Sequence, residues 1–196
     1  MKENSVYGVG INDADYVVQD HKTGWLCPFY STWHNMLLRC YSSVYHNRQP
    51  TYINCYVEPT WLRFRVFKMW MESKPWENNE LDKDILFQGN KVYGPTFCVF
   101  VSKQVNTFLS ERGANRGDYP IGVGLHKPSG LFRARCGDTK GGRRNLGYFR
   151  TPEKAHEAWL TFKLGQAKLL ALQQTDIRVA EALVKRYEDY KWITQS

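Results

Sequence analysis

Apolar residues recur at helical spacing in the first part of the chain. The stripe from Trp33 to Tyr41 predicts a helix, with Ser31 or Thr32 as its N-terminal cap. Pro59 suits a first helical turn, and the apolar positions between 64 and 71 continue a second helical stripe. The pattern therefore predicts two amphipathic helices before residue 72.

The middle of the chain reads as two strands followed by a helix. The runs LDKDIL and KVYGPTFCVFV flank FQGN, whose Gly-Asn pair favours a turn, so a β-hairpin is predicted. In the next run, SKQVNTFLSER, Val105, Phe108 and Leu109 fall on one face of a predicted helix. Region 81–112 is thus predicted to be strand, strand and helix. The polar stretch 113–118 is the predicted linker.

Three short strands are predicted between 121 and 149, and two helices after them. Thr151 and Pro152 open the first helix in the order expected for a cap, and the second begins near Asp176. Alternation along the strands assigns two faces. The apolar face comprises Ile121, Val123, Leu125, Phe132, Ala134, Cys136, Leu146 and Tyr148. The other face comprises Gly122, Gly124, His126, Arg133, Arg135, Asn145 and Gly147.

The predicted fold class is α+β, with two domains. Residues 1–112 form the first domain, 113–118 the linker, and 119–196 a three-stranded antiparallel sheet packed on a helix, with a C-terminal helix. Of the 196 residues, 42% are hydrophobic, which is enough to bury a core. No apolar run approaches the ~20 residues that span a bilayer. The first residues lack the apolar stretch of a secretory signal, so a cytoplasmic protein is expected.

The five cysteines are odd in number and contain no CxxC pair, which argues against a disulfide framework. Buried, reduced thiols are the favoured interpretation. A zinc site built from Cys27, Cys40, Cys55 and Cys98 remains open, although the spacing of these residues is not that of a zinc motif.

The charge is strongly basic and unevenly placed. The net charge is +8, which favours a polyanionic partner such as nucleic acid. Residues 1–118 hold 13 basic and 12 acidic residues, whereas 119–196 hold 14 and 7. The candidate DNA-binding residues are therefore in the second domain. They are His126, Lys127, Arg133, Arg135, Lys140, Arg143, Arg144 and Arg150.

These basic residues favour double-stranded DNA as the partner. A flat sheet face bearing Gly and Arg suits a major groove or a phosphate backbone. An RNA-binding module would need exposed aromatic residues on that face for base stacking. The alternative is a solvated polar face with no binding function. Such faces usually mix the two signs of charge, whereas between 119 and 151 the only acid is Asp138.

The stretch YPIGVGLHKPSGLFRARC…GGRRNLGYFRTPEKAHEAW resembles the apetala-type DNA-binding domain found in plant ethylene-response factors and in mobile phage nucleases. The resemblance covers about residues 119–172. It implies a three-stranded sheet laid in the DNA major groove and backed by one helix. Arg133, Arg135 and Arg144 would contact DNA, with His126 and Lys127 nearby. Plant members carry a sheet tryptophan where this chain has Phe132.

Oxygen-bearing side chains gather around the predicted central hairpin and the helix after it: Asp82, Asp84, Asn90 and Asn106, with Lys83 between the two aspartates. Carboxylate and amide oxygens suit Mg²⁺ or Mn²⁺, and a bound metal ion can assist phosphodiester hydrolysis. From the spacing alone, an exposed hairpin with ordinary turn residues is the stronger interpretation. Nuclease chemistry therefore needs further support.

That support is a second resemblance, covering about residues 5–112. The order W-x-x-M-L-x-R-C-Y, then a W…F…W helix, then LDKDIL…GNKVYGPTFCVFVSKQVN is similar to phage-borne HNH homing endonucleases, whose active site is a ββα-metal module. The resemblance implies that Asp82 and Asn106 bind the metal ion. Such an enzyme would act as a monomer on DNA, in the host cytoplasm if it is phage-encoded.

Two positions depart from that family. Lys83 stands where many members have the general-base histidine, and Phe97 where many have an asparagine. The base is therefore open between Asp84, His34 and metal-bound water, and Lys83 itself either acts as a base or stabilises developing charge. The predicted function is a metal-dependent, site-specific DNA endonuclease, either nicking or cutting both strands. A non-catalytic DNA-binding regulator is the alternative.

Overall fold

The computed structural model describes residues 5–110, 118–139 and 141–190. The chain divides into two compact units, Met1–Lys103 and Gln104–Ser196. Both units combine helices with small sheets, which is consistent with the α+β class. The predicted linker lies outside the described residues apart from Asp118.

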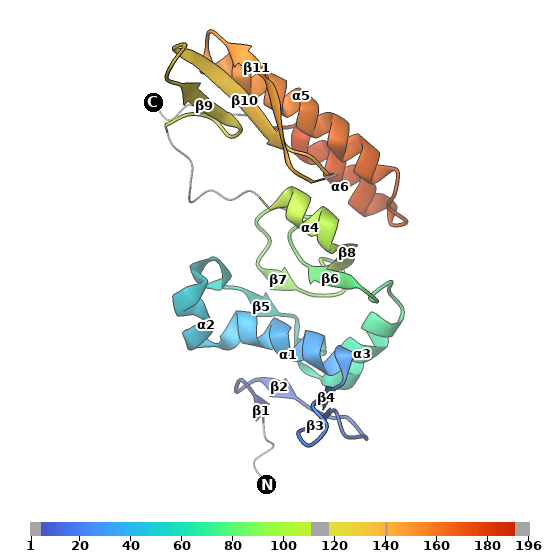
Figure 1. Ribbon diagram of the computed structural model, residues 1–196. Coiled ribbons are helices and arrows are strands. Elements are labelled where there is room, and N and C mark those ends of the chain that lie inside the picture. Colours follow the sequence, from blue (N-terminus) through green and yellow to red (C-terminus); the bar gives the residue numbers. More distant parts are fainter. Residues whose placement is uncertain (1–4, 111–117, 140, 191–196) are drawn as a thin grey trace. The chain divides into compact units, whose positions relative to one another are not determined.

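The first unit consists of short strands around three helices (Figure 1). Its helices are α1 (Pro28–Tyr41), α2 (Ser43–Arg48) and α3 (Phe64–Glu72), with 3₁₀ turns at Pro50–Tyr52 and Pro59–Leu62. Its strands are β1 (Ser5–Val6), β2 (Gly10–Ile11), β3 (Gln19–Asp20), β4 (Trp25–Leu26), β5 (Tyr56–Val57), β6 (Asn79–Asp82), β7 (Val92–Tyr93) and β8 (Val99–Ser102). The pairs β1–β2, β3–β4 and β6–β8 are antiparallel, and β5–β7 is parallel.

Aromatic side chains of α1 and α3 form the core of this unit. Trp33, Phe64 and Phe67 are completely buried, and the indole Nε1 of Trp33 donates a hydrogen bond to the carbonyl of Trp61 over 2.8 Å. Both predicted helices are confirmed, but Pro59 opens the separate 3₁₀ turn Pro59–Leu62 and not α3, which begins at Phe64. The predicted cap at Ser31 or Thr32 is wrong, because α1 begins one turn earlier with proline in its first turn.

The predicted central hairpin is also wrong. β6 pairs with β8, from Asn79 opposite Ser102 to Asp82 opposite Val99, so residues 83–98 form a long connection. Within that connection, β7 pairs with β5 instead of with β6. The Gly-Asn pair is a local turn inside the connection, where Asn90 N donates to the carbonyl of Phe87. The strand–strand–helix order survives, because β8 runs directly into the next helix.

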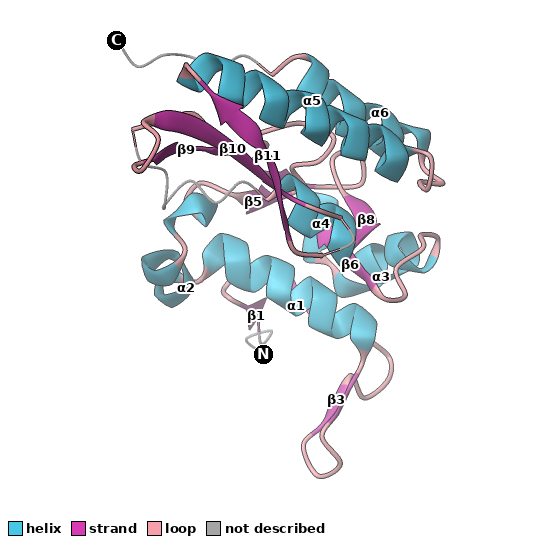
Figure 2. Cartoon of the chain, turned by 45° about the horizontal axis from the view of Figure 1, so that its top comes forward, coloured by secondary structure: helices cyan, strands magenta, loops and turns pink. Residues whose placement is uncertain are grey.

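The second unit is a three-stranded antiparallel sheet covered by helices. Its elements are α4 (Lys103–Leu109), β9 (Val123–His126), β10 (Leu131–Gly137), β11 (Arg143–Phe149), α5 (Pro152–Ala171) and α6 (Ile177–Glu188). The strand order is β11-β10-β9, and α5 and α6 lie on one side of the sheet (Figure 2). The three strands and the cap at Thr151 are confirmed, since Thr151 accepts from Lys154 N. The second helix begins at Ile177 as predicted, and Asp176 caps it by accepting from Arg178 N.

Helix α4 packs within the second unit. Phe108 is buried, and its ring lies 5.5 Å from the ring of Tyr187 on α6. Lys163 on α5 donates to the carbonyl of Phe108 over 2.8 Å and lies 3.6 Å from the centre of the Phe108 ring. The sequence grouped this helix with the N-terminal domain, whereas the division between units falls just before Gln104.

A β-bulge changes the face assignments on β11. β10 pairs with β11 in one register up to Ala134 opposite Gly147, and in another from Arg135 opposite Asn145, which leaves Leu146 as the extra residue. Residues directly opposite in an antiparallel pair share a face. Tyr148, opposite Arg133, is therefore on the basic face, and Gly147 is on the apolar one. The predicted assignments of these two residues are corrected accordingly.

Candidate metal site and nucleic-acid interface

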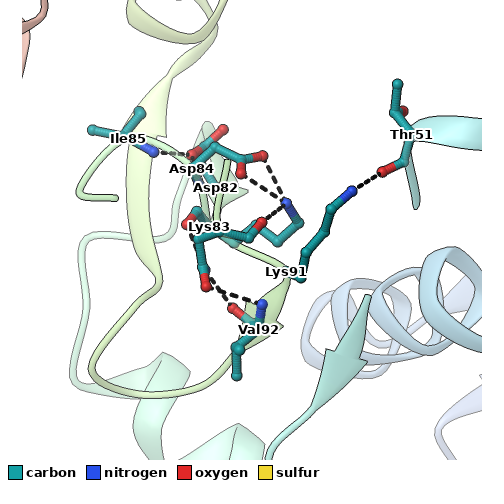
Figure 3. Close-up of polar contacts among 8 residues, drawn as sticks. Thr51, Asp82, Lys83, Asp84, Ile85, Lys91 and Val92 are labelled. Atoms are coloured by element: carbon teal, nitrogen blue, oxygen red, sulfur yellow. Dashed lines mark hydrogen bonds and ion pairs between the residues drawn. The ribbon is translucent and has the colours of Figure 1, made fainter. Parts of the chain in front are cut away.

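Asp82 ends strand β6 with its carboxylate held by the turn that follows. Oδ1 accepts hydrogen bonds from the backbone N–H of Asp84 at 2.7 Å and of Ile85 at 2.8 Å (Figure 3). Within the described residues, Oδ2 accepts no hydrogen bond. One oxygen of Asp82 therefore fixes the turn, and the other is available to a ligand.

Burial raises the pKa of Asp82 above the usual range for a carboxyl group, and the two backbone hydrogen bonds offset part of that shift. A nearby divalent cation would favour the ionised form. The chemistry of Asp82, a mostly buried carboxylate with one free oxygen, suits Mg²⁺ or Mn²⁺.

Lys83, the next residue, is buried, and its ammonium bonds to other groups than the Asp82 carboxylate. Its ammonium donates to both carboxylate oxygens of Asp84 at 2.8 Å and to the carbonyl of Asn90 at 2.5 Å (Figure 3). Only 5% of Lys83 is exposed, and the rings of Tyr52 and Tyr93 lie 5.9 Å from Nζ. Lys83 and Asp84 therefore satisfy each other.

Asn90, in the middle of the same connection, bonds back to its beginning. Its amide Nδ2 donates to the carbonyls of Lys83 and Val92, and its Oδ1 accepts from the N–H of Val92. Lys83, Asp84 and Asn90 form one internally satisfied cluster, called the Lys83 cluster below. All of these contacts hold the connection between β6 and β8 in shape.

The structure does not bring His34 to Asp82. The His34 ring lies among aromatic residues, with ring centres 5.1 Å from Tyr7 and 6.0 Å from Tyr30. No interaction within the described residues joins it to Asp82 or to the Lys83 cluster. Partial burial lowers the pKa of His34.

Asn106, the second candidate metal ligand, lies half-buried on α4. Its carbonyl accepts from both the N–H and the hydroxyl of Ser110. Asp82 belongs to the first compact unit and Asn106 to the second. Their joint action as ligands is therefore part of the proposal below.

The zinc site that the sequence left open gains no support from the described residues. Nowhere in the described ranges do three or more His, Cys, Asp or Glu side chains gather where they would hold a metal ion. All five cysteines are buried and free. Burial raises the pKa of Cys40 and Cys98 to about 12, so these thiols stay protonated and pack as small apolar side chains.

Positively charged side chains lie on the face of the sheet opposite to the apolar face, and this surface is called the basic face. Register places Arg133, Arg135, Arg143 and His126 on it. In the described part of the chain, the three arginines form no ion pair. His126 bonds to the hydroxyl of Ser129 at 2.8 Å, and its ring lies 4.9 Å from that of Tyr148.

The other predicted DNA-binding residues fall into three groups. Arg144 lies opposite Cys136, on the apolar side of the sheet, and forms an ion pair of 2.5 Å with Asp138. Lys127 and Arg150 are exposed. Lys140 lies outside the described residues. Arg144 is therefore already paired, in contrast to the three arginines of the basic face.

A cavity of about 750 Å³ opens beside the basic face. Arg133, Arg135 and Arg143 line it together with Trp159 and Lys163 of α5. Neither this cavity nor the place of Tyr148, which is 43% exposed on the basic face, was predicted from the sequence. Gly147 was the available signal, since a glycine inside a strand often marks a bulge.

Comparison with protein-family models, curated proteins and solved structures found no match. No helix among the described residues is both long enough and apolar enough to cross a membrane. Proposals about function therefore rest on the residues themselves and on the resemblances of the sequence.

Proposed function

We propose that the chain is a metal-dependent DNA endonuclease that uses Mg²⁺ or Mn²⁺. The observation that carries this proposal is the carboxylate of Asp82, which ends β6 beside β8 with one oxygen fixed and one free. β8 continues into α4, which carries Asn106. This order agrees with the ββα-metal arrangement that the sequence resembles.

In this proposal Asp82 would hold the metal ion, with Asn106 as the second ligand that the resemblance implies. The ion would supply charge stabilisation at the phosphate and a more acidic water. Lys83 and Asp84 hold the connection in shape and transfer no proton, because their charges are mutually engaged. The basic face binds duplex DNA through Arg133, Arg135 and Arg143.

The test is nicking or linearisation of supercoiled plasmid in Mg²⁺, Mn²⁺ or EDTA. Asp82→Asn keeps an oxygen that accepts the bonds from Asp84 and Ile85 but removes the charge. It should abolish cleavage, leave DNA affinity intact, and remove any rise in thermal stability caused by Mn²⁺. Glu80→Gln, an exposed acid on the same strand, is the matched control. Cleavage by Asp82→Asn at the parent rate would overturn the assignment.

A non-catalytic DNA-binding regulator is the second candidate. The Lys83–Asp84 ion pair favours it, because it occupies the position where the resembled family carries its general base. DNA binding without cleavage in either metal ion would select this function. Under either function, about five phosphate contacts would make log K fall against log salt with a slope of roughly −4 to −5.

A further inference from the structure

The cavity lies where the sheet loses its edge strand. β9 begins at Val123, opposite Ala134, and the last bond to this side of β10 runs from Arg135 N to the carbonyl of Gly122. β10 continues for two residues beyond that bond, to Gly137. Gly122, at φ +81°, turns toward α5 so closely that an added Cβ would lie 2.1 Å from Trp159 Cδ1. The cavity therefore reaches from the basic face toward α5.

Positive charge on one wall of the cavity lacks a counterion. Arg133, Arg135 and Arg143 line this wall, and no carboxylate in the described residues pairs with them. The Nε of Arg133 is also buried and has no hydrogen-bond partner among the described residues. Guanidinium groups match phosphate oxygens in geometry and charge, so one phosphate is the ligand group that this wall fits.

The rest of the lining is mainly apolar, with hydroxyl groups at one side. Ile121, Val123 and Trp159 contribute the apolar surface, and Thr107 and Ser110 of α4 contribute the hydroxyls. The volume of about 750 Å³ is within the range of about 300–1,000 Å³ that is usual for small-ligand sites. A lone phosphate would leave most of this surface bare, whereas a nucleotide adds a sugar and a flat base.

We propose that this cavity binds one nucleotide of a DNA strand after it has turned out of the duplex. The arginine wall holds its phosphate, and the apolar surface takes its base. A base that is stacked inside a duplex cannot enter a concave site, so the nucleotide must leave the stack. The proposal rests on the proposed DNA-binding function and adds that the protein favours an unpaired nucleotide.

Gly124 provides a variant that fills the cavity without disturbing the fold. It lines the cavity on β9, opposite Arg133, and an added Cβ would meet no heavy atom within 4 Å. Its backbone conformation is one that any residue adopts, so Gly124→Leu should fold. Arg135→Gln removes one charge from the wall instead. Arg150→Gln removes one charge from the same unit at an exposed position that does not line the cavity.

The experiment measures the affinity of the full chain for two fluorescent duplexes in EDTA, which prevents cleavage. One duplex is fully paired, and the other has a single bulged 2-aminopurine nucleotide. The bulged duplex should bind about tenfold more tightly, because its nucleotide is already unpaired. The 2-aminopurine emission should change on binding. Gly124→Leu and Arg135→Gln should reduce the ratio of the two affinities to about one, whereas Arg150→Gln should weaken both affinities and keep the ratio.

The possible failures are distinguishable. Absence of binding to either duplex overturns the proposed function together with the cavity proposal. Equal, salt-dependent binding of both duplexes overturns only the cavity proposal. Equal binding combined with competition by free deoxyadenosine monophosphate does so as well, since the cavity would then serve a free nucleotide. An unchanged ratio in folded Gly124→Leu also overturns it.

Discussion

The Lys83 cluster and the basic face handle positive charge in opposite ways. Lys83 is almost completely buried, and its three hydrogen bonds go to Asp84 and Asn90 of the same connection between β6 and β8. The arginines of the basic face line a cavity and have no carboxylate partner among the described residues. A buried charge requires an internal partner because its desolvation is costly. Unpaired charges at the surface are solvated by water instead. Lys83 is therefore part of the fold, whereas the arginines are the charges that the proposed function assigns to DNA binding.

The largest expected effect concerns the core of the second unit, which carries the basic face. Phe108→Ala removes the ring that packs on Tyr187 and under Lys163. The second unit should lose about 3–4 kcal/mol of unfolding free energy, as is typical when a buried phenylalanine is truncated. Hydrogen exchange should accelerate in α5 and α6 and remain unchanged in α1 and α3. Equal acceleration in both units would mean that the chain unfolds as one body.

The next effect concerns the Lys83 cluster. Lys83→Met keeps the length of the side chain but leaves the carbonyl of Asn90 and the carboxylate of Asp84 without their donor. The first unit should lose about 2–3 kcal/mol, the usual contribution of hydrogen bonds to a charged group. Denaturant unfolding measures this loss. Lys91→Met is the control, because the ammonium of that exposed lysine bonds, among the described residues, to the carbonyl of Thr51 alone. A Lys83 variant as stable as the parent would remove the structural role.

Substitutions on the basic face should lower DNA affinity and leave stability almost unchanged, the reverse of the result expected for Lys83. Arg133→Ala and Arg135→Ala should each weaken DNA binding by about 1–3 kcal/mol and reduce the salt slope by about 1. Neither should lower stability by more than about 0.5 kcal/mol, because neither residue forms an ion pair in the described structure. Arg144→Ala is the informative comparison, since its partner is Asp138. If Arg144→Ala weakened binding most, the division between paired and unpaired arginines would fail.

Local patterns predicted the helices and the C-terminal sheet, because capping and hydrophobic periodicity are encoded within a few residues. Thr151 and Asp176 each bond a backbone N–H only two or three residues away. The pairing of β6 with β8 is a long-range contact, and the Gly-Asn signal between them is local. The hairpin prediction failed for that reason.

In the candidate site too, the sequence predicted local features and missed those that depend on long-range contacts. Residue type and strand alternation made Arg133 and Arg135 candidate DNA-binding residues, and the resemblance to HNH endonucleases made Asp82 a candidate metal ligand. The sequence could not show that Lys83 faces Asp84 and Asn90, because that depends on how the whole connection closes. The bulge at Leu146 likewise moved Tyr148 to the basic face through a register shift that strict alternation does not contain. Long-range closure therefore decided which charges are paired.

The smallest expected effect concerns His34, the remaining candidate base. Its ring packs between Tyr7 and Tyr30, and partial burial lowers its pKa, so the folded state favours the neutral ring. The folded protein then binds fewer protons than the unfolded chain, and stability falls as pH drops through the unfolded value of about 6.5. His34→Phe keeps an aromatic ring in place and should lose slightly less stability than the parent between pH 7.5 and 5.5. Because no described contact joins His34 to Asp82, the variant should also keep the parent rate of metal-dependent cleavage and the same pH profile. A loss of cleavage with unchanged DNA affinity would make His34 the proton acceptor. Catalytic chemistry would then extend beyond the turn that follows Asp82.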